Sequence, residues 1–132
     1  MAELFSEEWM NQLKDAWNND PEIKDKLAEI KFNSVITCGF TSEEQPTSVF
    51  VVKNGECIHA GNWKNEESDW DMRADLSSWK KWMKKPLGLS AMGMAVATGK
   101  LKFNKGDYDN MIKNPSMAGP FIRSFSLMSQ IA

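Results

Sequence analysis

The side chains capable of acid–base or nucleophilic chemistry form no recognised catalytic pattern in this sequence. The single histidine, His59, lies in a stretch with the alternation of a strand, where an imidazole more often has a structural role. No serine is flanked as in a G-x-S-x-G nucleophile elbow, and no glycine-rich phosphate loop follows an expected strand. We therefore predict no catalytic residue and a protein that is not an enzyme, with no metal and no cofactor.

Neighbouring carboxylates, as a general acid would require, include the pairs at 43–44, 66–67 and 69/71. The pairs at 43–44 and 66–67 fall in polar stretches that predict solvated loops. Asp69 and Asp71 are two residues apart in a strand-like run, so their side chains would share one face. A general acid needs burial to raise its pKa. The alternation of this run predicts instead that the face carrying Asp71 is exposed to solvent.

The two cysteines, Cys38 and Cys57, lie in apolar, strand-like runs without the spacing of a metal site or a C-x-x-C motif. Buried free thiols in a reducing compartment are the natural interpretation. The first residues lack the basic and apolar regions of a signal peptide, and no apolar run reaches the ~18 residues that span a bilayer. The last residues do not form a peroxisomal address. We therefore expect a cytoplasmic protein.

A cluster of lysines occupies positions 80, 81, 84 and 85 of a chain whose net charge is only -2. That balance argues against a nucleic-acid surface, which needs a concentrated basic face. Two interpretations of the cluster stay open. It is either one solvated face of a helix or a patch that contacts anionic lipid headgroups.

Apolar periodicity and capping residues predict the helices. Phe5, Trp9, Leu13 and Trp17 recur every four residues and form one stripe. The expected helices cover residues 5–18, 21–30, 76–84, 90–98, a short segment around 108–112, and 119–131. The helix over 90–98 is apolar all round, which predicts that it is buried on most sides.

Runs rich in β-branched residues predict five strands, over residues 34–40, 47–53, 56–61, 70–75 and 100–104. Asn54-Gly55 is a strong hairpin signal because both positions tolerate positive φ. The first three strands should therefore form an antiparallel meander. In the fourth, Trp70, Met72 and Ala74 alternate with polar residues, which predicts one buried and one solvated face.

Two runs in the second half of the chain resemble the sterol carrier protein 2 (SCP2) family. They are Trp70–Trp79, WDMRADLSSW, and Thr98–Asp107, TGKLKFNKGD, where a strand follows an apolar helix. The order of the expected elements is similar to that family over nearly the whole chain. Two segments, 62–69 and 114–119, look longer or more polar than in vertebrate sterol carriers, which argues against sterol itself as the ligand.

The resemblance implies a single SCP2-like domain over residues 1–132. It implies an α/β (α+β) fold with a five-stranded, mostly antiparallel sheet, helices on one face, and an apolar tunnel between them. The implied function is non-enzymatic binding and transfer of fatty acyl chains, acyl-CoA, phospholipid or sterol-like lipids. The implied partner is a lipid ligand. Transient contact with a membrane surface is a separate expectation, which rests on the lysine cluster.

Nine methionines and six tryptophans could supply an adaptable apolar lining for such a ligand. The candidate lining residues are Phe50, Trp79, Trp82, Met83, Met92, Met94, Val96, Phe103, Met111, Phe121, Phe125 and Met128. Lys81, Lys84 and Lys85 are the candidates for contact with a charged headgroup. For every apolar candidate, ordinary core packing is the competing interpretation.

The last helix is the candidate gate of the tunnel, because Pro115, Gly119 and Pro120 precede it and suit a hinge. Two other functions stay open. One is an accessory protein-interaction domain that presents an apolar groove to a partner. The other is a small hydrolase or isomerase, which would need His59 or Asp71 in a cavity with a shifted pKa.

Overall fold

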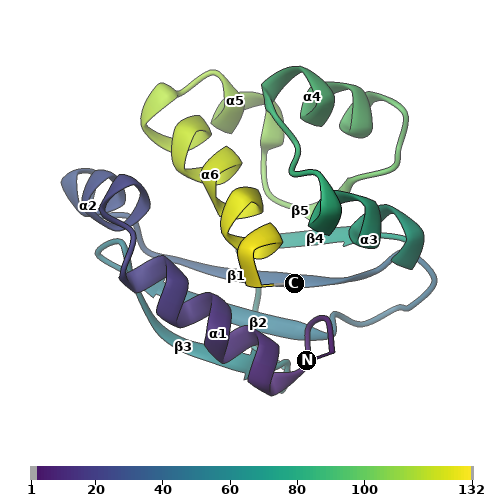
Figure 1. Ribbon diagram of the computed structural model, residues 1–132, viewed down its shortest axis with the longest axis horizontal. Coiled ribbons are helices and arrows are strands. Elements are labelled where there is room, and N and C mark those ends of the chain that lie inside the picture. Colours follow the sequence, from purple (N-terminus) through teal and green to yellow (C-terminus); the bar gives the residue numbers. More distant parts are fainter. Residues whose placement is uncertain (1–2, 132) are drawn as a thin grey trace.

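The computed structural model describes residues 3–131, and its centre is a five-stranded sheet in the order β3-β2-β1-β4-β5 (Figure 1). The strands are β1 (Ser34–Phe40), β2 (Ser48–Lys53), β3 (Glu56–Asn62), β4 (Trp70–Ala74) and β5 (Lys102–Lys105). All neighbouring pairs are antiparallel except β1 and β4, which run parallel. The predicted mostly antiparallel sheet of five strands is confirmed.

Helices gather on one face of this sheet, as predicted (Figure 1). They are α1 (Glu7–Asn18), α2 (Pro21–Glu29), α3 (Leu76–Lys84), α4 (Leu89–Ala97), α5 (Tyr108–Ile112) and α6 (Pro115–Ile131). Helix α1 packs along β3 and β2, whereas α6 packs chiefly against the helices α1, α2, α3 and α5. The helical layer therefore has α6 as its central element.

Local hydrogen bonds explain why most helices begin where the sequence predicts. The side chain of Ser6 accepts from the backbone N–H of Trp9, and Asp20 accepts from the N–H of Glu22 in front of α2. The last helix differs, because it begins at Pro115 rather than at Gly119. Pro120 therefore lies inside α6. Having no N–H, it deprives the helix of one internal hydrogen bond.

The hairpin predicted at Asn54-Gly55 is present and also anchors two helices. Gly55 has φ +82°, and a Cβ there would lie 2.5 Å from the backbone nitrogen of Ala28 in α2. Its carbonyl oxygen accepts a hydrogen bond of 2.9 Å from the indole Nε1 of Trp17. A glycine is required at this turn because both the φ value and the close approach of α2 exclude a side chain.

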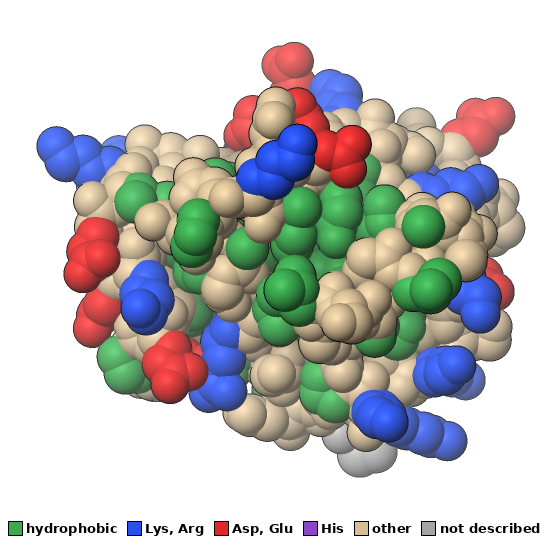
Figure 2. Space-filling view, turned by 90° about the horizontal axis from the view of Figure 1, so that it is seen from above, with side chains coloured by type: hydrophobic (Ala, Val, Ile, Leu, Met, Phe, Trp, Pro, Cys, Tyr) green, Lys and Arg blue, Asp and Glu red, His purple; other side chains and the backbone are tan. Residues whose placement is uncertain are grey.

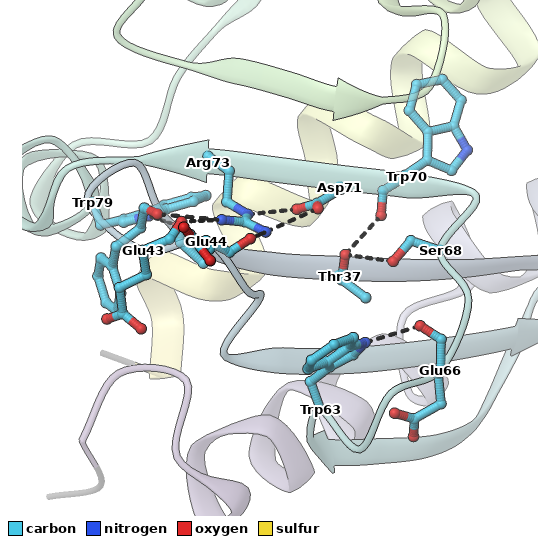
Figure 3. A network of polar contacts seen from close by, with 12 residues as sticks. Thr37, Glu43, Glu44, Trp63, Glu66, Ser68, Trp70, Asp71, Arg73 and Trp79 are labelled. Atoms are coloured by element: carbon cyan, nitrogen blue, oxygen red, sulfur yellow. Dashed lines mark hydrogen bonds and ion pairs between the residues drawn. The ribbon is translucent and has the colours of Figure 1, made fainter.

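The prediction of a solvated face on β4 is wrong. Asp71 is 8% and Arg73 2% exposed, on the sheet face opposite the helices. The Arg73 Nε lies 2.7 Å from Asp71 Oδ1, and its Nη1 donates to the carbonyl oxygen of Glu43 at 2.7 Å (Figure 3). Residues 41–47 and 62–69 fold over this face and exclude water. The alternation of β4 could not reveal this cover, since loops distant in sequence provide it.

The prediction that the apolar helix α4 is buried on most sides is also wrong. Of its nine residues only Met92 and Ala95 are buried, whereas Leu89 is 58% and Met94 65% exposed. Helix α4 lies at the outside of the molecule, beyond α3 and β5 (Figure 1). Packing within the chain therefore does not account for its apolar composition, and the exposed apolar face needs another explanation.

We expect loss of either member of the buried Asp71–Arg73 pair to lower the free energy of unfolding by about 3–5 kcal/mol, because the remaining charge would stay buried without its partner. Asp71→Ala and Arg73→Met, measured by urea denaturation, test this. The double variant should cost less than the sum of the single variants. Single-variant losses below about 1 kcal/mol, as at exposed pairs, would contradict the expectation.

Candidate functional site

A cavity of about 70 Å³ lies between the sheet and the helical layer, and its walls are almost entirely apolar. The sheet supplies its floor, α1 one wall, and α5 and α6 its roof. The lining residues are Phe5, Trp9, Met10, Leu13, Trp17, Leu27, Phe32, Ile36, Cys38, Phe50, Trp70, Met72, Met111, Met117, Pro120, Phe121, Ser124 and Met128.

The register of three strands assembles the floor. Ile36 of β1 is opposite both Phe50 of β2 and Trp70 of β4, and Cys38 is opposite Met72. Paired residues of neighbouring strands project from the same side of a sheet, so these five side chains share the cavity face. Among them, Phe50 is a lining residue that the sequence predicts.

Helix α1 supplies one wall through the apolar stripe that repeats every four residues. Trp9, Leu13 and Trp17 all line the cavity and are at most 5% exposed. The polar indole nitrogen of Trp17 is bound to Gly55, so the helix presents hydrocarbon to the void. The apolar stripe that forms this wall is recognisable in the sequence. Nothing in the sequence shows, however, that the stripe faces a void.

The roof comes from the start of α6 together with Met111 of α5. Pro120, Phe121 and Met128 project toward the cavity from α6. Ser124 also lines it, but its hydroxyl donates to the carbonyl oxygen of Phe121 and so is already satisfied. The hydroxyl of Ser124 is therefore not held ready to anchor a ligand.

The predicted lining residues separate into three groups. Those at the cavity are Phe50, Met111, Phe121 and Met128. Those buried in the core beside it are Trp79, Trp82, Met83, Met92 and Phe125. Those outside it are Met94, which is exposed, and Val96 and Phe103, which line a separate hollow.

Trp79 explains why the α3 residues are packed away from the cavity. Its ring lies 5.0 Å from Phe5 and 5.3 Å from Trp82, both edge to face. Its Nε1 donates to the carbonyl oxygen of Gly39 at 3.0 Å. Trp79 is thus a fixed centre of core packing between α3 and β1 rather than part of an adaptable wall.

The separate hollow is open to solvent and lies between the end of α4, β5 and α5. Its lining is mixed, with Val96, Leu101, Phe103 and Tyr108 beside polar residues that include Asp107. Figure 2 shows hydrophobic side chains gathered in a hollow of the face seen from above, with charged side chains at its rim. The ring of Phe103 is 6.0 Å from that of Phe121 in the cavity roof, so this aromatic pair separates hollow from cavity.

The candidate headgroup lysines do not lie at the cavity. Lys81, Lys84 and Lys85 are exposed on the outer side of α3, whose opposite side carries the buried Trp79 and Met83. Their contact with a headgroup stays a prediction.

The groups considered for catalysis are not brought to the cavity either. His59 is exposed on β3, and Asp71 is bound to Arg73 on the opposite face of the sheet. Residues 3–131 contain no group of three His, Cys, Asp or Glu side chains placed to hold a metal ion. Burial raises the pKa of the Cys38 thiol to about 12. The cavity therefore supports binding through apolar contact rather than acid–base chemistry.

Solved structures of other proteins share this fold. A crystal structure of sterol carrier protein 2 is 17% identical and covers 98% of this chain and 100% of its own, with a TM-score of 0.75. A conserved hypothetical protein from Thermus thermophilus, described as possibly a sterol carrier protein, is 20% identical, covers 98% of this chain and 90% of its own, and has a TM-score of 0.70. No family model and no curated protein matches the sequence.

A third solved structure, described as the UbiJ-SCP2 ubiquinone synthesis protein, is 12% identical and covers 92% of this chain and 88% of its own, with a TM-score of 0.59. At these identities the likeness shows the fold. The resemblance to SCP2 predicted from Trp70–Trp79 and Thr98–Asp107 is thus confirmed as a shared fold.

We expect both native thiols to resist an aromatic disulfide reagent at mildly alkaline pH. Burial raises the pKa of Cys38 and of Cys57 from 9.0 to about 12, so the folded protein holds little thiolate there. The same shift stabilises the folded protein. This stabilisation is complete at pH values below the thiol pKa of the unfolded chain, and it is lost as the pH rises through the higher thiol pKa of the folded protein. Rapid labelling of the native protein, monitored by absorbance with the urea-unfolded protein as reference, would contradict this.

Proposed function

We propose that this chain is a non-enzymatic carrier that binds an apolar lipid between its sheet and its helices and delivers it elsewhere. The observation that carries the proposal is the almost wholly apolar cavity under α5 and α6. Burial of each ligand methylene is worth about 0.8 kcal/mol, so a hydrocarbon chain needs no polar anchor to bind there. The candidate ligands are fatty acyl chains, acyl-CoA, phospholipid and sterol-like lipids.

The cavity has to expand when such a ligand binds. An engineered cavity of about 150 Å³ holds a benzene molecule, and the void of about 70 Å³ is smaller than that. Its lining contains five methionines, whose unbranched side chains change rotamer at low cost. The lining methionines are Met10, Met72, Met111, Met117 and Met128.

Helix α6 is the element best placed to move. It packs chiefly on other helices, and Pro120 interrupts its internal hydrogen bonding near the start. Gly119 has open space where a side chain would project. The hinge proposed at Pro115, Gly119 and Pro120 is therefore within the first turns of α6 rather than in front of it.

The proposal is tested by native mass spectrometry of the protein purified from its host. We expect an adduct with the mass of a lipid that organic extraction removes. One solved neighbour is described as a ubiquinone synthesis protein, so the adduct has to be identified by fragmentation and not assumed from the fold. A protein that leaves its host without lipid, and that takes up no fluorescent fatty acid in solution, would contradict the proposal.

Filling the cavity from its roof should weaken binding. In Met128→Trp the larger side chain would take the place of about two ligand methylenes, worth about 1.6 kcal/mol or roughly fifteenfold in Kd. Titration with a fluorescent fatty acid measures this, and thermal unfolding verifies that the variant folds. Met94→Trp is the matched control, because Met94 is exposed outside the cavity. Equal affinities of the two variants would place the ligand elsewhere.

A further inference from the structure

The positive charge of this chain is concentrated in one continuous segment. Residues 76–106 contain seven lysines and no aspartate or glutamate, whereas the remaining positions hold nine basic and eighteen acidic side chains. The segment is made of α3, α4, β5 and their connections. The seven are Lys80, Lys81, Lys84, Lys85, Lys100, Lys102 and Lys105.

All seven lysines are exposed, and none is neutralised within the part of the chain that the structure describes. Among residues 3–131 the ion pairs are those of Arg73 with Asp71 and of Arg123 with Asp20 and Glu22. No lysine elsewhere in residues 3–131 forms an ion pair either, so what distinguishes this segment is that it holds seven lysines and no carboxylate. Its positive field is therefore available to an external anionic surface.

The same segment carries most of the exposed large apolar side chains. Five such residues occur in residues 3–131, and three of them, Leu76, Leu89 and Met94, lie here. Leu89 and Met94 belong to α4, which has no charged residue in its nine positions. Packing does not account for this exposure, since α4 contacts the core through Met92, Ala95 and the half-buried Val96, and not through Leu89 or Met94.

The lysines and the apolar helix are neighbours in space. Helix α3 ends at Lys84, and a short connection leads through Lys85 directly into α4, which begins at Leu89. Val96 of α4 lines the same open hollow as Lys102 and Phe103 of β5, and Figure 1 shows the connection from α3 leading into α4.

We propose that α4 docks in the interface of an anionic phospholipid bilayer, with Leu89 and Met94 inserted and the lysines of α3 and β5 at the headgroups. The inference rests on the proposed carrier function and names the membrane surface it uses. An apolar helix with flanking lysines combines the two interactions that hold an interfacial helix, apolar burial and attraction to anionic lipid. No helix in residues 3–131 is long and apolar enough to cross a bilayer.

The position of this surface also suits a carrier. The open hollow begins at Val96 of α4 and is bounded by Phe103, whose ring touches Phe121 of the cavity roof. A lipid leaving the bilayer at α4 would meet this hollow first. Displacement of the Phe103–Phe121 pair would then join the hollow to the apolar cavity.

Co-sedimentation with vesicles tests the docking. The protein should bind vesicles that contain phosphatidylglycerol and phosphatidylcholine, and not vesicles of phosphatidylcholine alone, with binding that weakens at high salt. Lys84→Gln and Lys85→Gln should each lower the partition coefficient about fivefold. Lys24→Gln and Lys26→Gln on α2 are the matched controls and should change it little. Equal effects of both pairs would overturn the assignment of the surface.

Insertion of α4 is tested with an environment-sensitive thiol dye at Met94→Cys. The native cysteines are buried, so the new thiol is the one that reacts. The dye emission should shift to the blue with anionic vesicles. Ile58→Cys on β3 is the control, because Ile58 is 52% exposed but distant in sequence from the lysine segment. A blue shift at position 58 and none at 94 would overturn the proposal, as would an equal shift at 94 with soluble polyglutamate, which would indicate an acidic protein partner.

Fatty acid binding in vesicle-free solution separates the two proposals. Leu89→Asp with Met94→Asp should abolish vesicle binding and leave fatty acid affinity unchanged, since neither residue lines the cavity. Ile58→Asp should alter neither. Wild-type protein that binds vesicles but no fatty acid would refute the carrier function alone. Wild-type protein that binds fatty acid but no anionic vesicles would refute the docking alone.

Discussion

The parallel pairing of β1 with β4 constrains the rest of the structure. After β3 the chain has to cross the sheet before it can enter β4 in the direction of β1, and residues 62–69 make this crossing on the face opposite the helices. The hydroxyls of Thr37 and Ser68 are 2.9 Å apart (Figure 3). The Asp69 carboxylate accepts a hydrogen bond from the backbone N–H of Val35. The crossing therefore covers one face with hydrogen-bonded loop and leaves the other to the helices.

On the helical face, the void follows from how α6 is supported. Helix α6 packs chiefly on α1, α2, α3 and α5, so it bridges the sheet rather than lying on it. Long side chains fill most of the space beneath, with aromatic contacts such as Trp79 to Phe5 holding the edges. Methionines supply much of the rest, and a small apolar volume remains. The hydrocarbon atoms that line such a void lack van der Waals partners on one side. An apolar ligand in the void would supply those contacts.

The distribution of charge complements this interior. The cavity holds no ionised lining residue, and the Asp71–Arg73 pair satisfies its own charges behind the sheet. Half of the 14 lysines lie instead in residues 76–106, a segment without aspartate or glutamate that contains the exposed helix α4. The apolar cavity and the lysine segment therefore occupy different parts of one chain, which meet at Phe103 and Phe121. A charge inside the cavity would be costly to bury without a partner.

The sequence by itself determined what depends on neighbours along the chain. The caps at Ser6 and Asp20, the Asn54-Gly55 turn and the alternation of the strands predicted the elements to within a few residues, except the start of α6. The two runs that resemble SCP2 predicted the fold. Only the tertiary structure decided that Asp71 is buried, that α4 is exposed, and that Trp9 and Met72 face the void whereas Trp79 and Met92 do not. Periodicity reports which side of an element is apolar, but what lies opposite that side is set by segments distant in sequence.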